Sequence, residues 1–333
     1  MHDFLRAAFA CAVAATCCLC AAAATTNALA ASADAYPSKP VRFINTQTPG
    51  ASVDTISRVL ATRMSEELGA QIVVDNRAGA GGLIALEIVA QATPDGYTLL
   101  AAATGAQVIT PHIFKKIKYH PLRDFTPISL YAITHNLLVV NPNLPVKSVQ
   151  DLIAYAKANP GKLNMANAGA GFQSHLAGVL LTYMTGMDVV HVPYKGGGAS
   201  VLAVMTNESQ VTIGPAPAML THVRAGRLRA LATGGERRTP LMPDLPTAIE
   251  AGVPGYVSTG WIGLSAPKAL PKAIVDKLHA TLVKVVTMPA TREAFENQGA
   301  DAVTSTPAEF ARFIRDEYER FGQAVRLANL KVE

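Results

Sequence analysis

Short apolar runs rich in β-branched residues alternate with amphipathic runs at helical spacing, and this alternation limits the possible folds more than any other feature. Strand-like runs in the first part lie at residues 41–47, 71–75 and 97–103, with helix-like runs at 55–68 and 79–92 between them. The same rhythm returns at residues 163–167, 189–194, 210–213 and 228–233. Strands that alternate with helices at this spacing form parallel βαβ units. The sequence therefore predicts an α/β protein, with Asp54 as the N-cap of the first helix. Ser148 and Asp151 are expected to form the cap of a later helix that ends near Ala158.

Two longer extended stretches interrupt this rhythm. Residues 125–133 and 137–140 are apolar runs with little helix between them, and residues 257–266 form a second bridge. The chain ends in three helical runs, the last opened by a capping box of Thr306 and Glu309. Two βα blocks joined by two crossings predict two lobes that close over a ligand by hinge motion. We expect lobe 1 to comprise residues 34–137 plus 262–333, and lobe 2 residues 138–261.

The first 33 residues are expected to be a signal peptide outside the fold. Arg6 provides a short positive region, residues 7–24 are almost wholly apolar, and small-residue patterns fit cleavage after Ala30 or Ala33. The alternative is an uncleaved membrane anchor, although the apolar run is at the short edge of the roughly 20 residues that a spanning helix needs. The sequence thus predicts export to the periplasm as a soluble protein.

Composition and missing motifs exclude several functions. The four cysteines all lie in the leader, at positions 11, 17, 18 and 20, so the remaining chain offers no disulfide, thiolate metal site or cysteine nucleophile. The net charge of +5 forms no basic stripe and aromatic residues make up 6%, which argues against nucleic-acid binding. A glycine cluster at residues 79–82 lacks the acidic partner of a dinucleotide site, and the histidines show no metal-ligand spacing. We expect no cofactor and no metal.

Ser174 and His175 are the one adjacent pair that could serve as nucleophile and base. Neighbouring residues on a helix point about 100° apart, so we expect Ser174 to cap the helix and His175 to pack against it. A hydrolase that uses Ser174 and His175 stays as an unfavoured alternative.

Small residues gather at four strand-to-helix junctions, and these are the candidate binding site. The junctions are residues 46–54, 103–107, 167–174 and 214–218. Ligands of parallel α/β sheets bind at the carboxyl ends of strands, where free N–H groups at helix starts receive anions. Two junctions from each lobe, facing one cleft, could hold a carboxylate without any arginine. The alternative is that these junctions are only tight turns.

A series of short motifs carries a family resemblance across almost the whole chain after the leader. The motifs are YPSKP at 36–40, DNRAGAGG at 75–82, PDGYTLL at 94–100, DLIAYAKANPGKL at 151–163, SHLAG at 174–178, HVPYKG at 191–196, AGRLRAL at 225–231 and EAGVPGY at 250–256. In this order and spacing they resemble the substrate-binding subunits of tripartite tricarboxylate transporters, the Bug family of bacterial periplasmic proteins.

The resemblance implies a type II periplasmic-binding-protein fold that holds a small carboxylate between its lobes without catalysis. Implied partners are the inner-membrane subunits of such a transporter or, alternatively, a membrane sensor, with the chain itself a monomer. The resulting set of predicted ligand-binding residues is Gln47, Thr48, Pro49, Gly50, Ala51, Ser52, Asp54, Thr104, Gly105, Gln107, Gly169, Ala170, Gly171, Phe172, Gln173, Ser174, Tyr194, Gly214 and Pro215.

This chain departs from the family pattern at several of these positions. The family commonly has an aromatic residue at position 47, proline at 48 and glycines at 51 and 52, where this chain has Gln47, Thr48, Ala51 and Ser52. Many relatives carry an aspartate at Gly214, suited to a ligand ammonium group. Its replacement by glycine predicts a ligand without a free amine. Phe172 and Gln173, at positions where relatives often have Thr-Ser, are expected to supply an apolar wall and a polar contact.

Overall fold

A computed structural model describes residues 36–114, 116–169 and 172–327. The predicted signal peptide and the candidate site residues Ala170 and Gly171 lie outside the described residues.

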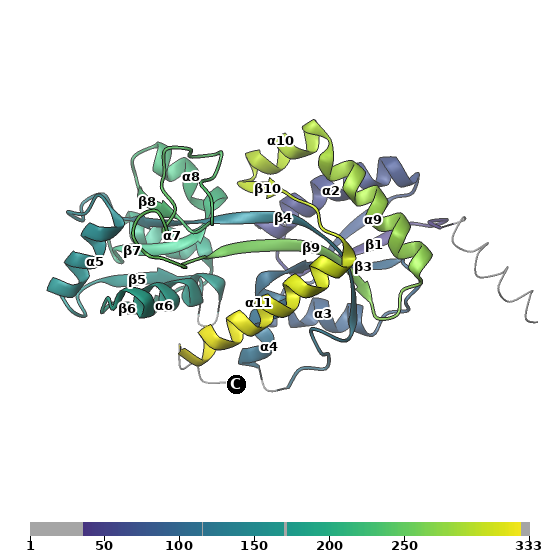
Figure 1. Cartoon of the computed structure of the whole chain (residues 1–333), viewed down its shortest axis with the longest axis horizontal. Helices are drawn as coiled ribbons and strands as arrows, with labels where there is room; N and C mark the ends of the chain where they lie inside the picture. Colours follow the sequence, from purple (N-terminus) through teal and green to yellow (C-terminus); the bar gives the residue numbers. More distant parts are fainter. Residues whose placement is uncertain (1–35, 115, 170–171, 328–333) are drawn as a thin grey trace, which may run out of the picture.

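The first half of the sheet is built from parallel strands with helices on both faces (Figure 1). The strands pair in the order β2 (Ile72–Asn76), β1 (Val41–Asn45), β3 (Thr98–Ala103). The connections are α2 (Ser52–Leu68), then the 3-10 turn η1 (Ala80–Gly82) with α3 (Leu83–Ala90). The predicted βα rhythm is confirmed here, but Asp54 is not an N-cap. The helix begins earlier, with Ala51 at the cap position, and places Asp54 in its first turn.

One long strand, β4 (Phe125–Val140), replaces the two separate apolar runs predicted between residues 125 and 140. It pairs with the antiparallel β9 (Thr259–Pro267) as far as His135, and with β7 (Val211–Pro215) from Asn136 onward. The polar residues Thr134, His135 and Asn136 interrupt the apolar pattern in the sequence, yet all three are buried. They lie where β4 passes from one half of the sheet to the other, so their polarity marks the crossing rather than the end of a strand.

The second half of the sheet repeats the architecture of the first. Its strands are β6 (Val190–Pro193), β5 (Asn164–Asn167), β7 and the end of β4, with β8 (Arg229–Thr233) also pairing with β4. Its helices are α5 (Val149–Ala158), α6 (Gln173–Thr185), α7 (Gly197–Met205) and α8 (Ala216–Arg224). The expected cap of α5 is confirmed, because Ser148 Oγ accepts a hydrogen bond from Asp151 N at 3.0 Å.

The C-terminal helices return to the first half, as predicted. They are α9 (Lys272–Thr287), α10 (Pro289–Asn297) and α11 (Pro307–Leu327), with a short strand, β10 (Ala300–Ala302), before the last. Thr306 and Glu309 form the expected capping box at the start of α11, since each side chain accepts a hydrogen bond from the other residue's backbone N–H. Figure 1 shows α11 running diagonally beneath the crossing strands, and its far end contacts α6 of the second half.

Each half has a hydrophobic core on both faces of its sheet. In the first half α2 and α9 cover one face, and α3 and α11 cover the other. In the second half α5 and α6 cover one face, and α7 and α8 cover the other. Leu137, the last residue of the first predicted segment of lobe 1, packs in a core of the second half. Trp261, the last residue of predicted lobe 2, packs in a core of the first half. The division into two lobes stays an interpretation of this sheet.

Among the described residues, no helix combines the length and the apolar character needed to cross a membrane.

Candidate ligand-binding site

Strand register makes the carboxyl ends of the parallel strands in the two halves point toward each other. β3 ends at Ala103, which pairs with Ile262 of β9, and Ile262 in turn pairs with Ala132 of β4. β7 ends at Pro215, which pairs with Asn136 of β4 and runs opposite to it. β3 runs in the same direction as β4, and β7 runs in the opposite direction. The carboxyl ends of β3 and β7 therefore face one another. At about 3.3 Å per residue, the step from Ala132 to Asn136 spans roughly 13 Å.

The remaining junctions lie at the same level. β1 is parallel to β3, and β5 is parallel to β7, so each pair of strands ends at one edge of its half. The four predicted junctions are therefore gathered between the two halves. This is the arrangement in which carboxyl strand ends form ligand sites in open α/β sheets.

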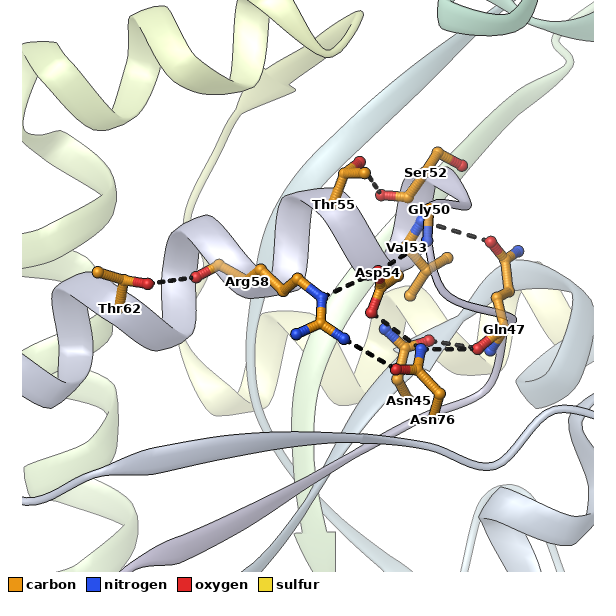
Figure 2. A network of polar contacts seen from close by, with 10 residues as sticks. All are labelled: Asn45, Gln47, Gly50, Ser52, Val53, Asp54, Thr55, Arg58, Thr62 and Asn76. Carbon is orange, nitrogen blue, oxygen red and sulfur yellow. Dashed lines mark hydrogen bonds and ion pairs between the residues drawn. The ribbon is translucent and has the colours of Figure 1, made fainter.

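A buried carboxylate fixes the shape of the first junction (Figure 2). Asp54 is only 2% exposed. Its carboxylate accepts hydrogen bonds from Gly50 N at 2.9 Å, Asn76 Nδ2 at 2.9 Å and Arg58 Nε at 3.0 Å. Asn76 Nδ2 also donates to Gln47 O at 2.9 Å. Asp54 is thus committed to holding the loop between β1 and α2 in place.

The same contacts set the protonation state of Asp54. Burial alone raises the pKa of a carboxyl group, but the hydrogen bonds from Arg58, Gly50 and Asn76 outweigh burial and hold the pKa of Asp54 below its ordinary value. The carboxylate is therefore ionised at neutral pH, with Arg58 beside it as the opposite charge.

Two asparagines end corresponding strands in the two halves and present amide donors. Asn45 ends β1 and its Oδ1 accepts from Gln47 N at 2.9 Å; Asn167 ends β5 and its Oδ1 accepts from Gly169 N at 3.0 Å. These bonds fix the amide orientations and leave the two Nδ2 groups buried, with no partner among the described residues. A buried donor without a partner is costly, so these amides can gain stability from a ligand acceptor.

Neither asparagine is among the predicted ligand-binding residues, although Asn167 begins the predicted junction 167–174. The signal was available, because each is a strand-ending Asn followed by a turn. An Asn side chain that binds the backbone N–H two residues on is a known turn former. Other buried atoms that lack a partner within the described ranges lie at the same level; they are Thr46 Oγ1, Asn136 Nδ2 and Gln173 Nε2.

Three predicted side chains are used elsewhere in the fold. Gln107 is fully buried and donates to Pro121 O at 2.6 Å. Thr104 Oγ1 accepts from Trp261 N at 2.8 Å, which ties the start of η2 (Gly105–Ile109) to the crossing strand β9. Tyr194 donates to Glu208 at 3.0 Å. These contacts stabilise the surroundings of the site and do not point to ligand contacts by these side chains.

The start of α6 differs from its predicted capping. Phe172 holds the N-cap position without a side-chain bond, and Ser174 Oγ instead accepts from Ala168 N at 2.9 Å. Phe172 is 52% exposed, with its ring against Gly169. Gln173 lies beside Gly260 of β9, so its amide reaches the crossing strands. His175 packs its ring against His191.

The other predicted residues lie at the junctions with fewer side-chain contacts. Thr48, Pro49 and Gly50 are exposed, whereas Ala51 and Ser52 are half-buried at the start of α2. The N-cap residue Ala51 makes no side-chain bond to that helix. One of the first helical N–H groups, Val53 N, donates instead to Gln47 Oε1 at 3.3 Å. The remaining ones, Gly105, Gly214 and Pro215, lie at the ends of β3 and β7.

A mainly apolar pocket of about 90 Å³ lies between α6 and α11. Of the predicted site residues, only Gln173 lines it. The described part of the chain contains no group of three or more His, Cys, Asp or Glu side chains placed to hold a metal ion.

Comparison with known proteins identifies the family. The family model described as "Tripartite tricarboxylate transporter family receptor" matches residues 56–330. The chain belongs to this family. The family resemblance read from the sequence is therefore confirmed.

Relatives of this tripartite tricarboxylate receptor agree in sequence and in fold. Protein BugT of Bordetella pertussis is 37% identical over 303 residues, covering 91% of this chain and 93% of BugT. The solved structure of R. palustris Rpa4515 with adipate is 33% identical, with a TM-score of 0.81, and covers 89% of this chain and 99% of that one. MatC from Rhodopseudomonas palustris with bound malate is 30% identical, with a TM-score of 0.76, covering 87% and 100%. These likenesses confirm the predicted fold class.

Proposed function

We propose that this chain is a periplasmic solute-binding protein that captures a small carboxylate between its two lobes and delivers it to the membrane subunits of a tripartite transporter. The observation that carries the proposal is the pair of strand-ending asparagines, Asn45 and Asn167. Each comes from a different half, each is held by the same kind of turn, and each keeps a buried amide donor for an acceptor atom. The chain is proposed to act as a monomer.

The charges near the site favour an anion recognised by neutral donors. None of the predicted site residues is a lysine or arginine, so recognition rests on amide groups and on the N-terminal N–H groups of α2 that Gln47 does not take. The one acidic residue among them, Asp54, is already bound by Arg58, Asn76 and Gly50. No free carboxylate is thus left to receive a ligand ammonium group, and Gly214 adds none.

The relatives indicate the size of the ligand. Rpa4515 and MatC hold adipate and malate, two dicarboxylates without an amine. We propose a ligand of the same class for this chain, with binding and no catalysis. Ser174 supports this view, because its hydroxyl holds the turn before α6 by accepting a hydrogen bond from Ala168 N.

A thermal-unfolding screen against matched acids tests the proposal. Adipate and malate represent dicarboxylates, glutamate and aspartate add an ammonium group, and adipamide removes the charges. One or more dicarboxylates should stabilise the chain, by about 2.7 kcal/mol at a hundredfold excess over Kd. The amino acids and the amide should not. Stabilisation by the amino acids alone would contradict the proposal.

Variants of the two asparagines locate the binding site. We expect Asn45→Ala and Asn167→Ala each to weaken the binding of the stabilising acid roughly 10- to 100-fold, because a hydrogen bond to a charged group contributes about 1.5–3 kcal/mol. Asn297→Ala, on the exposed end of α10, is the matched control and should bind as the original chain does. Calorimetric titration measures all three; unchanged affinity in both site variants would place the ligand elsewhere.

A further inference from the structure

Two histidines and a methionine meet beneath α6, outside the proposed carboxylate site. Met165 of β5 and His191 of β6 are direct partners in the parallel register, so their side chains lie next to each other on one face of the sheet. α6 covers this face, and its Gly178 lies over the pair. His175 is three residues before Gly178 and therefore on the same side of the helix.

Distances around Gly178 show how closely these groups approach. A Cβ placed on Gly178 would lie 2.6 Å from Met165 Sδ and 3.4 Å from His191 Nδ1. His191 Cε1 lies slightly nearer, at 3.1 Å, so the glycine leaves room for the Met165 sulfur and for the Cε1–Nδ1 edge of the His191 ring. The ring centroids of His175 and His191 are 5.4 Å apart and the rings are tilted by 69°. With metal–nitrogen distances of about 2.0–2.1 Å, two imidazoles on one ion have centroids roughly 5–5.5 Å apart.

One nitrogen on this edge of the His191 ring is available as a ligand. His191 Nδ1 is buried and has no hydrogen-bond partner among the described residues. Burial and the neighbouring His175 lower the pKa of His191 to about 4, and burial lowers the pKa of His175. Metal ions bind imidazole through a ring nitrogen that carries no proton.

We propose that Met165 Sδ, His191 Nδ1 and a nitrogen of His175 form a binding site for a soft monovalent metal ion, Cu⁺. Thioether sulfur selects Cu⁺ among the biological metals, and imidazole suits copper as well. All three groups are neutral, so a single positive charge is less costly to hold here than the double charge of Zn²⁺. Structural zinc sites use four ligands, often thiolates, which this cluster lacks.

The sequence could not indicate this site by ligand spacing. The histidines are sixteen positions apart and belong to different elements, and the third ligand is a methionine. They come together only because β5 and β6 pair in this register and α6 crosses above them.

A Cu⁺ competition titration tests the site. The full sequence is expressed and purified, and Cu⁺ is supplied without oxygen as its bicinchoninate complex, whose loss of colour reports transfer to the protein. We expect one Cu⁺ per chain, with affinity reduced tenfold or more by Met165→Leu or His191→Gln, on the order seen when metal surroundings are altered. The controls are Met187→Leu, in the same core, and His222→Gln, in the same half. Both should bind as the original chain does.

Two further measurements distinguish loss of the metal site from a general loss of stability. Met165→Leu keeps the side-chain volume, so its metal-free unfolding midpoint should match that of Met187→Leu. X-ray absorption at the copper edge should show a sulfur neighbour that disappears in Met165→Leu. Equal Cu⁺ binding in all variants, or no copper–sulfur signal in the original chain, would overturn the proposal and indicate an adventitious ion only. Cysteines 11, 17, 18 and 20 are blocked with N-ethylmaleimide in every variant, so neither the Cu⁺ count nor the copper–sulfur signal comes from their thiols.

Discussion

Replacing Asp54 with alanine is expected to lower the free energy of unfolding by about 2 kcal/mol and to weaken carboxylate binding at least tenfold. Three hydrogen bonds end on this buried carboxylate, from Gly50, Asn76 and Arg58. Hydrogen bonds to a charged group are among the stronger ones, and removal of their acceptor leaves buried donors without a partner. The loop between β1 and α2 would then lose the conformation that presents its N–H groups.

Asp75→Ala is the matched control for this prediction. Asp75 also binds arginines, Arg42 of β1 and Arg77, but these ion pairs do not reach the loop between β1 and α2. Exposed ion pairs contribute about 0–1 kcal/mol, so this variant should be nearly as stable as the original chain and bind the acid normally. Urea denaturation and calorimetric titration measure both effects. An Asp54→Ala protein that binds normally would show that the loop does not depend on this carboxylate.

Acid should remove the same stabilisation. The pKa of Asp54 is lowered in the folded chain from 3.8, so its contribution is present above that value. The contribution is lost as pH falls through the folded pKa, because the unfolded state then takes up the proton first. The difference in stability between Asp54→Ala and the original chain should therefore shrink as pH falls below about 3.8. A difference that grows at low pH would contradict this assignment.

Replacing Gly263 with alanine is expected to cost about 3 kcal/mol of stability, at the upper end of what overpacking costs in a dense core. Gly263 is in β9, between Ala102 of β3 and Leu130 of β4. A Cβ there would lie 2.0 Å from the nearest ring atom of Phe310 in α11. Phe310 is fully buried and packs edge-on against Trp261, so its ring has no free space to move into.

Two further variants separate this clash from other effects of the substitution. Gly198→Ala in α7 meets nothing within 4 Å and should be neutral or stabilising by up to about 1 kcal/mol, because alanine favours helix. Adding Phe310→Leu to Gly263→Ala should cost less than the two single effects summed, because the pair is in direct contact. Equal stability of Gly263→Ala and Gly198→Ala would mean that α11 does not pack closely on the crossing strand.

The parts of the fold that follow from local signals could be predicted from the sequence. The alternation of apolar and amphipathic runs marked the strands and helices, and Ser148 and Thr306 cap the expected helices. The continuity of β4 could not be predicted in this way, because Thr134, His135 and Asn136 are polar and nevertheless buried at the crossing. Ser174 was predicted to be the cap, but it lies two residues after the N-cap position of α6, where its hydroxyl accepts a hydrogen bond from Ala168 N instead.

The strand-to-helix junctions of the candidate site could be predicted from the sequence, but the hydrogen bonds between their side chains could not. Strand ends could be placed because parallel strands share an edge. Partners that are distant in sequence decide the rest. Gln107 is used by Pro121. Asn45 and Asn167 become comparable only when the carboxyl ends of β1 and β5 are seen to face each other across the crossing.

The most direct test is a crystal structure of the chain with the acid that stabilises it most. We expect one carboxylate between the two halves of the sheet, with an oxygen about 3 Å from Asn45 Nδ2 or Asn167 Nδ2 and near the start of α2. A ligand bound elsewhere, for example in the pocket between α6 and α11, with both amides still unpaired, would contradict the proposed site.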